Sequence, residues 1–308
     1  EIAEKIGDFR HVGIWAGNLG NAYAALGEHR KAIEYHQKHL ESARQAVDLR
    51  GQGHAYANLG VSHAELSEYG AAKDFYQKHL GIACQLGDKR DECHARFSMG
   101  LTFFQENDLD ESEKCFSQAM KIAQDANIKE LAALAMSGRA DILLERQQYH
   151  TAIELLEDAL NLLDSFNDIA VEMRLLESLG NAHSLLEDYP KALAFYQRKL
   201  QKARQSGQKV AICNALTNQI GVYRALGEFD LAFIHAQTAL KLADELEQKS
   251  STAFIYWQLG LIEELQGNYQ LAKRYMQETL DYEKQVNHLD LGSHQIRFNL
   301  LLEKIEDL

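Results

Sequence analysis

A Leu-Gly or Met-Gly dipeptide returns along this chain at intervals of 40 residues or a multiple of 40, and this period limits the possible folds more than any other feature. Two further positions keep the same register, one filled mainly by alanine from Ala32 onward and one mainly by leucine from Leu40 onward. A fixed period of this length indicates a repeat protein, in which each unit buries its apolar side chains against the next unit. The dipeptides are Leu19-Gly20, Leu59-Gly60, Met99-Gly100, Leu179-Gly180 and Leu259-Gly260.

Each period is predicted to contain two helices joined by a short turn. In the first copy we expect one helix from about Arg10 to Leu26 and a second from about His29 to Val47. Gly27, between the two, suits the end of a helix because glycine adopts left-handed backbone without strain. The chain is rich in Ala, Leu, Glu, Gln and Lys, which favour helix. The sequence therefore predicts an all-α chain.

Leu19-Gly20, followed by Tyr23 and by Ala32 twelve residues after the glycine, resembles the tetratricopeptide repeat pattern. The usual unit of that family has about 34 residues, and the longer unit seen here is similar to the Pins/LGN type and to arrays in bacterial sensor and signalling proteins. The resemblance implies a right-handed α-solenoid of about seven helix pairs, with partial or capping helices at both ends. It implies a single superhelical domain over residues 1–308, with repeats at approximately 9–48, 49–88, 89–128, 129–168, 169–208, 209–248 and 249–288 and a capping helix at 289–308.

The start of the chain and the fourth copy both deviate from the regular repeat. The segment Glu1-Ile2-Ala3 aligns with Gly81-Ile82-Ala83 inside a second helix of a pair, so we expect the chain to be a fragment of a longer protein. The fourth copy departs most from the pattern, because Ala140 replaces the glycine and Leu143 replaces the aromatic residue. Local packing is therefore hardest to predict in that copy.

The charge and composition exclude several classes of partner. The formal net charge is −13, which argues against a nucleic-acid partner because phosphate binding requires clustered Lys and Arg. The acidic balance fits either a solvated surface or a basic partner. No apolar run reaches the roughly 18 residues that would predict a membrane span. Four cysteines without a C-x-x-C pair indicate a reducing compartment, so we expect a cytoplasmic protein.

The sequence carries no sign of an enzyme. It contains no phosphate-binding loop, no dinucleotide fingerprint, no H-E-x-x-H and no G-x-S-x-G. His36 and His39 lie three residues apart on one predicted helix, and His79 repeats His39 one period later. Because they repeat in step with the fold, we assign them a structural role. We therefore expect no catalytic residue, no metal and no cofactor.

The resemblance also implies where a ligand would bind, because the first helix of each pair lines the concave side of a tetratricopeptide array. Relative to the repeat glycine, the groove positions are six before, three before, one after and four after. They predict a polar first section, an apolar middle section, a second polar section and an apolar end. The residues expected to line this groove are Asn21, His54, Phe97, Leu101, Phe104, Leu134, Asp141, Leu144, Arg174, Glu177, Asn181, Asn214, Thr217, Arg224, Phe254, Trp257 and Leu261.

Two alternatives stay open at this point. Phe97 and Phe104 fit either the groove or the packing between neighbouring helices, and Arg174 with Glu177 fits a surface ion pair on one helix. The binding mode in which a tetratricopeptide module clamps a C-terminal carboxylate is not expected. That mode needs a lysine three residues before the repeat glycine, and no copy has one there.

Two functions follow from this pattern. The first is a non-catalytic scaffold that binds a peptide or a protein segment in the concave groove. The alternative is a regulatory or sensor array that controls an ATPase, protease or DNA-binding effector domain of the same longer protein or complex.

Overall fold

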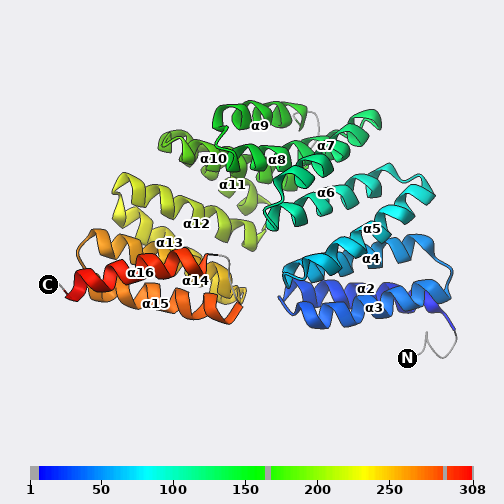
Figure 1. Cartoon of the computed structure of the whole chain (residues 1–308), viewed down its shortest axis with the longest axis horizontal. Helices are drawn as coiled ribbons and strands as arrows, with labels where there is room; N and C mark the ends of the chain where they lie inside the picture. The colour runs from blue at the N-terminus through cyan, green and yellow to red at the C-terminus, as the bar shows by residue number, and fades with distance from the viewer. Residues whose placement is uncertain (1–6, 164–167, 287–289, 307–308) are drawn as a thin grey trace. The chain divides into compact units, whose positions relative to one another are not determined.

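The computed structural model describes residues 7–163, 168–286 and 290–306, and every regular element in them is an α-helix (Figure 1). The predicted all-α class is therefore confirmed. None of these helices is long and apolar enough to cross a membrane. The helices are α2 Phe9–Ala25, α3 His29–Gln45, α4 Leu49–Glu65, α5 Tyr69–Leu86, α6 Lys89–Gln105, α7 Leu109–Asp125, α8 Lys129–Glu145, α9 Tyr149–Leu163, α10 Ile169–Leu185, α11 Tyr189–Gln205, α12 Lys209–Leu226, α13 Phe229–Glu245, α14 Lys249–Leu265, α15 Tyr269–Val286 and α16 Leu291–Glu306.

The turns between helices repeat at half the sequence period. In the described residues, the backbone has positive φ at every twentieth position from Gly7 to Gly267; six of these residues are glycines and seven carry side chains. At the first complete turn, the Gly27 N–H donates to the Ala24 carbonyl and the Glu28 N–H donates to the Tyr23 carbonyl, both at 2.9 Å. This pair of bonds is the Schellman motif, which satisfies carbonyls at the end of a helix.

Aspartate side chains satisfy backbone donors where several helices begin. The Gly51 N–H donates to the Asp48 carboxylate at 3.0 Å at the start of α4. The Glu111 N–H donates to Asp108 at 3.2 Å at the start of α7. Pro190, the one proline of the chain, lies in the first turn of α11, where its missing N–H leaves no helical bond unmade.

Small residues set the close contacts within each pair. The alanine position is fully buried in all seven copies, with serine in the third. At the repeat glycine the partner helix comes so near that a Cβ on Gly100 would lie 2.7 Å from Cε1 of Phe116. The fourth copy has Ala140 at this position, and its Gly138 on α8 approaches Phe116 of the preceding pair from the other side. The residues of the alanine position are Ala32, Ala72, Ser112, Ala152, Ala192, Ala232 and Ala272.

The helices form two compact units, residues 1–178 and 179–308, and each is described by itself. In the first unit, Leu59 is fully buried and clusters with Leu40 of the preceding α3. Leu19 holds the same place in the first copy, yet it is 48% exposed. The leucine that serves the stack in the second copy is therefore open to solvent in the first. The expectation for Glu1-Ile2-Ala3 falls outside the described residues.

In the second unit, α16 packs on α15 and buries Phe298 and Leu301 against Trp257 and Met276. This helix lies within the segment where a terminal helix was expected from the sequence. A second cluster joins helices α12, α13 and α14 around Leu216, Ile220 and Ile255.

Candidate peptide-binding groove

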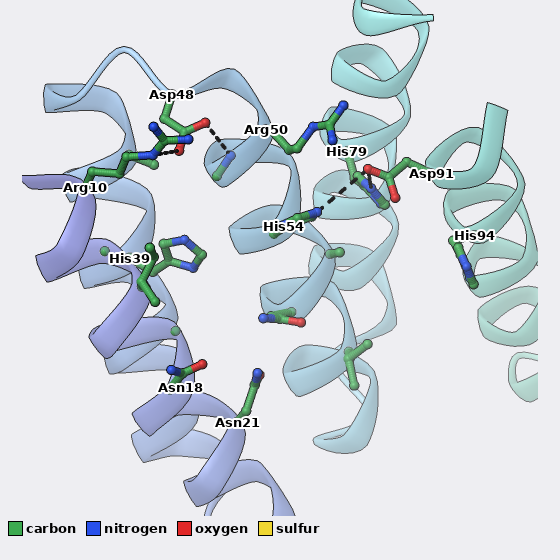
Figure 2. Close-up of a pocket in the computed structure, with 18 of the residues that line it drawn as sticks. Arg10, Asn18, Asn21, His39, Asp48, Arg50, His54, His79, Asp91 and His94 are labelled. Atoms are coloured by element: carbon green, nitrogen blue, oxygen red, sulfur yellow. Dashed lines mark hydrogen bonds and ion pairs between the residues drawn. The ribbon is translucent and has the colours of Figure 1, made fainter. Parts of the chain in front are cut away.

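A cavity of about 640 Å³ opens on the first unit, and we call it the N-terminal cavity. Its walls come from α2, α4 and α6, the first helices of three successive pairs (Figure 2). Polar side chains line it in a row, with Asn18 and Asn21 on α2, Asn58 on α4 and Ser98 on α6. The volume lies within the range of about 300–1,000 Å³ that is usual for ligand pockets.

Two histidines reach the cavity from the second layer of helices. His39 of α3 lies against Gly13 and Gly17 of α2, where an added Cβ would meet the imidazole at 3.2 Å and 2.9 Å. His79 of α5 lies less closely against Gly53, where an added Cβ would be 3.3 Å from Ile82 and 3.6 Å, an ordinary contact distance, from the imidazole. Glycines on the inner helix therefore open the space through which an imidazole from the outer helix lines the cavity.

The third and sixth pairs fill the same two positions with cysteine on the inner helix and alanine on the outer helix. In the third pair, the Cys93 thiol donates to the Ala119 carbonyl at 3.5 Å. In the sixth pair, Cys213 donates to Ala239 at the same distance. With a side chain on the inner helix and alanine on the outer helix, the layers close directly on each other. The glycine and histidine combination is confined to the first two pairs.

The charged groups around the cavity are unequally paired. Arg10 lies 3.7 Å from Asp48, and Arg50 lies 3.6 Å from Asp88. Asp91 faces two imidazoles: its Oδ2 is 4.0 Å from Nε2 of His54 and 3.8 Å from Nε2 of His79 (Figure 2). Burial lowers the pKa of His79 although Asp91 acts in the opposite direction, so this imidazole is neutral near pH 7.

Of the residues predicted to line the groove, Asn21 and His54 lie in the N-terminal cavity, and both are exposed. The apolar middle section is half-buried along its whole length. Phe97 packs its ring 5.2 Å from that of the buried Phe116, so it contributes to the packing between helices while keeping one side accessible. The other half-buried members of this section are Leu101, Phe104, Leu134 and Leu144.

The polar side chains in the second polar section of the first unit form hydrogen bonds with one another. The Arg174 guanidinium donates to the Ser137 hydroxyl at 2.8 Å and to the Asp141 carboxylate at 2.9 Å, and it lies 5.5 Å over the ring of Phe97. Ser178 donates to the other oxygen of Asp141 at 3.2 Å. Burial raises the pKa of Asp141, and Arg174 opposes that rise. Arg174 therefore joins α10 to α8, and Glu177 on the same helix is half-buried.

In the second unit, the residues predicted to line the groove differ in exposure and in the groups that they contact. Asn181 and Asn214 are exposed, and Asn181 accepts a hydrogen bond of 2.7 Å from the Tyr196 hydroxyl. Thr217 is buried and donates to the Cys213 carbonyl. Arg224 donates to Gln258 at 3.1 Å, and burial lowers its pKa. Phe254 is 47% exposed, and Leu261 packs against the α16 cluster.

Trp257 corrects the expectation of an open aromatic end. It is only 6% exposed, because α16 covers it and places the His294 imidazole 3.8 Å from its ring. His294 in turn lies 2.7 Å from the Glu283 carboxylate. The Trp257 side chain packs within the cluster formed with α16, so we leave Trp257 out of the groove that we propose below.

Several cavity residues are not predicted by the sequence pattern. His39 and His79 lie on second helices and repeat in step with the fold, which indicated a structural role, and Asn18, Asn58 and Asp91 lie on first helices outside the four groove positions. The sequence does contain a signal. Gly13 and Gly53 coincide with His39 and His79, whereas later copies have larger residues opposite Ala119 and Ala239. Among the described residues, no group of three or more His, Cys, Asp or Glu side chains is placed to hold a metal ion.

Family models for the tetratricopeptide repeat match residues 12–85, 91–165 and 211–284, and a second model with the same description matches residues 175–210. The chain belongs to the tetratricopeptide repeat family. This confirms the resemblance seen in the sequence, and the fold of that family is typically a non-catalytic scaffold for protein interaction or regulation. No curated protein matches the chain.

Solved structures share the fold at low sequence identity. A Rap protein complexed with competence and sporulation factor matches with a TM-score of 0.65 and 16% identity, over 92% of this chain and 87% of that one. The apo form of the quorum sensor NprR from B. thuringiensis matches with a TM-score of 0.60 and 12% identity, over 98% of this chain and 100% of that one. A signal transduction ATPase with a tetratricopeptide repeat sensor, from Pyrococcus horikoshii, matches with a TM-score of 0.62 and 15% identity, over 85% of this chain and 42% of that one.

Proposed function

We propose that this chain is a non-catalytic scaffold that binds a peptide or an extended protein segment in the N-terminal cavity. The observation that carries the proposal is the row of amide and hydroxyl side chains that three successive inner helices present over a floor of glycine and alanine. The four cysteines are free, in keeping with the cytoplasmic location that we propose.

The chemistry of this row suits a polypeptide backbone. An asparagine amide offers donors and an acceptor, so it can pair with both the carbonyl and the N–H of a peptide unit. Asn18 and Asn21 lie near one end of the row and Asn58 on the next inner helix, so an extended segment could be held at successive peptide units. The half-buried Phe97 and Leu101 follow on α6 and offer apolar contacts for side chains of that segment.

The comparisons agree with this proposal in kind. Proteins of the same fold include a Rap protein complexed with competence and sporulation factor and the quorum sensor NprR. Their identity to this chain is too low to transfer a ligand, so the proposal rests on the cavity.

The test is a capture experiment with a synthetic mixture of peptides of random sequence. The chain should retain a subset of the mixture, and Ala57→Trp should abolish retention because Ala57 lines the cavity and an indole would fill it. Ala25→Trp is the matched control, since Ala25 is exposed at the end of α2 and lies outside the cavity. Equal retention by wild type and Ala57→Trp would contradict the proposal.

A second function is a regulatory array that controls an effector domain. The observation that favours it is the shared fold with the tetratricopeptide sensor of a signal transduction ATPase, of which this chain spans less than half. Removing residues 1–308 from the full-length gene product should change the basal activity of the effector domain. A full-length product without any further domain would exclude regulation in cis.

A further inference from the structure

We propose that the N-terminal cavity contains a subsite for a primary ammonium group, formed by the Asp91 carboxylate and the imidazole nitrogens of His54 and His79. The inference rests on the proposed function, because it names the chemistry of one ligand residue in that cavity. The ammonium group would come from a lysine side chain or from the amino terminus of the bound segment.

The first observation is a carboxylate without a cation. Asp48 and Asp88 each face an arginine at 3.6–3.7 Å. Asp91 lines the cavity with its side chain 23% exposed, and within the described residues its side chain is in ion-pair range of His54 and His79 alone. The nearby Arg90 is bound to Glu130 instead. A partly buried carboxylate that lacks a cation of its own favours a ligand that supplies one.

The second observation is an unsatisfied buried nitrogen in the same place. His79 is 3% exposed, and its Nε2 has no hydrogen-bond partner. Figure 2 shows this imidazole turned toward Asp91, on the side of the cavity that His54 also faces. Nε2 is also closed to solvent, so the His79 ring must turn slightly before a ligand donor can reach it. A buried polar atom without a partner is destabilising, and a donor that reached it would remove that penalty.

The distances between these groups suit one shared donor. The gaps of 3.8 Å and 4.0 Å between Asp91 Oδ2 and the two imidazole nitrogens are too long for direct hydrogen bonds. Acceptors at this separation can each receive one N–H of a single ammonium nitrogen, since bonds to charged groups measure about 2.7–2.9 Å. An ammonium group carries three such donors and no acceptor, which matches one carboxylate and two imidazoles.

The charge of the site selects against the opposite ligand. Burial lowers the pKa of His79, and burial also lowers the pKa of His94 on α6, so neither imidazole neutralises Asp91 near pH 7. A ligand carboxylate would therefore meet an uncompensated negative charge. The net charge of −13 for the whole chain acts in the same direction by attracting a basic ligand.

The experiment uses four synthetic peptide mixtures with random flanks. Three are acetylated at the amino terminus and carry Lys, Glu or norleucine at one fixed position, and the fourth carries norleucine and a free amino terminus. We expect wild type to retain the Lys mixture or the free-terminus mixture roughly tenfold over acetylated norleucine, equivalent to about 1.4 kcal/mol. The mixture that is enriched identifies the source of the ammonium group.

Asp91→Asn should remove this preference while the acetylated norleucine peptides are still retained. Asp91→Lys should move the preference to Glu, which a purely structural role for Asp91 would not do. The matched control is Asp74→Asn, which changes an exposed carboxylate of α5 outside the cavity and should keep the Lys preference. Circular dichroism and thermal unfolding confirm that each variant is folded.

The outcomes separate the two proposals. If no mixture is retained more by wild type than by Ala57→Trp, the proposed function and this inference both fail. If peptides are retained but ammonium groups are not preferred, or if the preference survives in Asp91→Asn, this inference alone is overturned and peptide binding stands.

Discussion

The second and sixth helix pairs share one backbone plan but use the same two positions in opposite ways. In the second pair, His79 of the outer helix lies beside Gly53 of the inner helix and lines the cavity. In the sixth pair, Cys213 takes the place of Gly53 and bonds to the Ala239 carbonyl. One residue on the inner helix and one on the outer helix therefore decide whether the layers close on each other or open into a polar cavity.

The two regions also differ in their apolar cores. Around the sixth pair, Leu216, Ile220 and Ile255 belong to one cluster that spans four helices, α11 to α14. Around the second pair, one cluster of buried residues in the described part of the chain contains Leu40, Ala55 and Leu59. Apolar clusters of different size therefore accompany the two arrangements.

The largest effect expected from this comparison is on stability. Ile220→Ala should lower the free energy of unfolding by about 2–5 kcal/mol, because the side chain is fully buried in an apolar cluster. His39→Ala in the cavity wall should lower it by less than about 1 kcal/mol, since Nδ1 of that imidazole has no hydrogen-bond partner to lose. Urea unfolding followed by circular dichroism measures both, and equal losses would show that the cavity wall is a structural core.

A second effect concerns pH and a buried histidine in the first pair. His36 is 1% exposed beneath the Gly20 contact, and burial lowers its pKa from 6.5 to about 4, with His39 acting in the same direction. Between these values the unfolded chain binds a proton that the folded chain does not. His36 therefore makes the protein less stable as the pH falls from about 6.5 to 4, with a slope near 1.4 kcal/mol per pH unit.

His36→Tyr should remove this contribution, because Tyr76 occupies the same place over Gly60 in the second pair. The difference in unfolding free energy between variant and wild type should grow by about 3 kcal/mol between pH 7 and pH 4. The other buried histidines titrate in both proteins and cancel in the comparison. Unfolding curves across this range test the expectation, and a difference that does not change with pH would refute it.

The smallest effect on stability is expected when the residues of the sixth pair replace those of the second pair at the two compared positions. The double variant Gly53→Cys with His79→Ala gives the second pair the residues of the sixth, so we expect a change in unfolding free energy within about 1 kcal/mol. Retention of random peptides should fall, because the cavity loses the His79 imidazole from its lining. Unchanged retention would show that the glycine and histidine combination does not form the binding surface.

The fold was accessible from the sequence because its determinants are local and periodic. The expected helix from Arg10 to Leu26 is α2, Phe9–Ala25, and the expected turn at Gly27 has positive φ. These features follow from residues within one copy. The family models confirm the tetratricopeptide repeat assignment over most of the chain.

The candidate site was accessible only in part because its members are defined by neighbours in other helices. Asn21 and His54 were found by their register on the inner helices. His79 was not, since its access to the cavity depends on Gly53 in a different helix. Trp257 was expected to be open because nothing within its own copy shows that α16 covers it. The groove assignment for the remaining residues stays a prediction.

The turns described above recur every twenty residues with the same left-handed backbone position. If a segment encoding forty residues is duplicated or deleted, the new junction again joins the end of one helix to the start of another. The turn at that junction is one that the chain already uses at other places. Such an event adds or removes a complete helix pair without requiring a new connection. Binding surface can thus be lengthened by unequal recombination first and refined by point mutation afterwards.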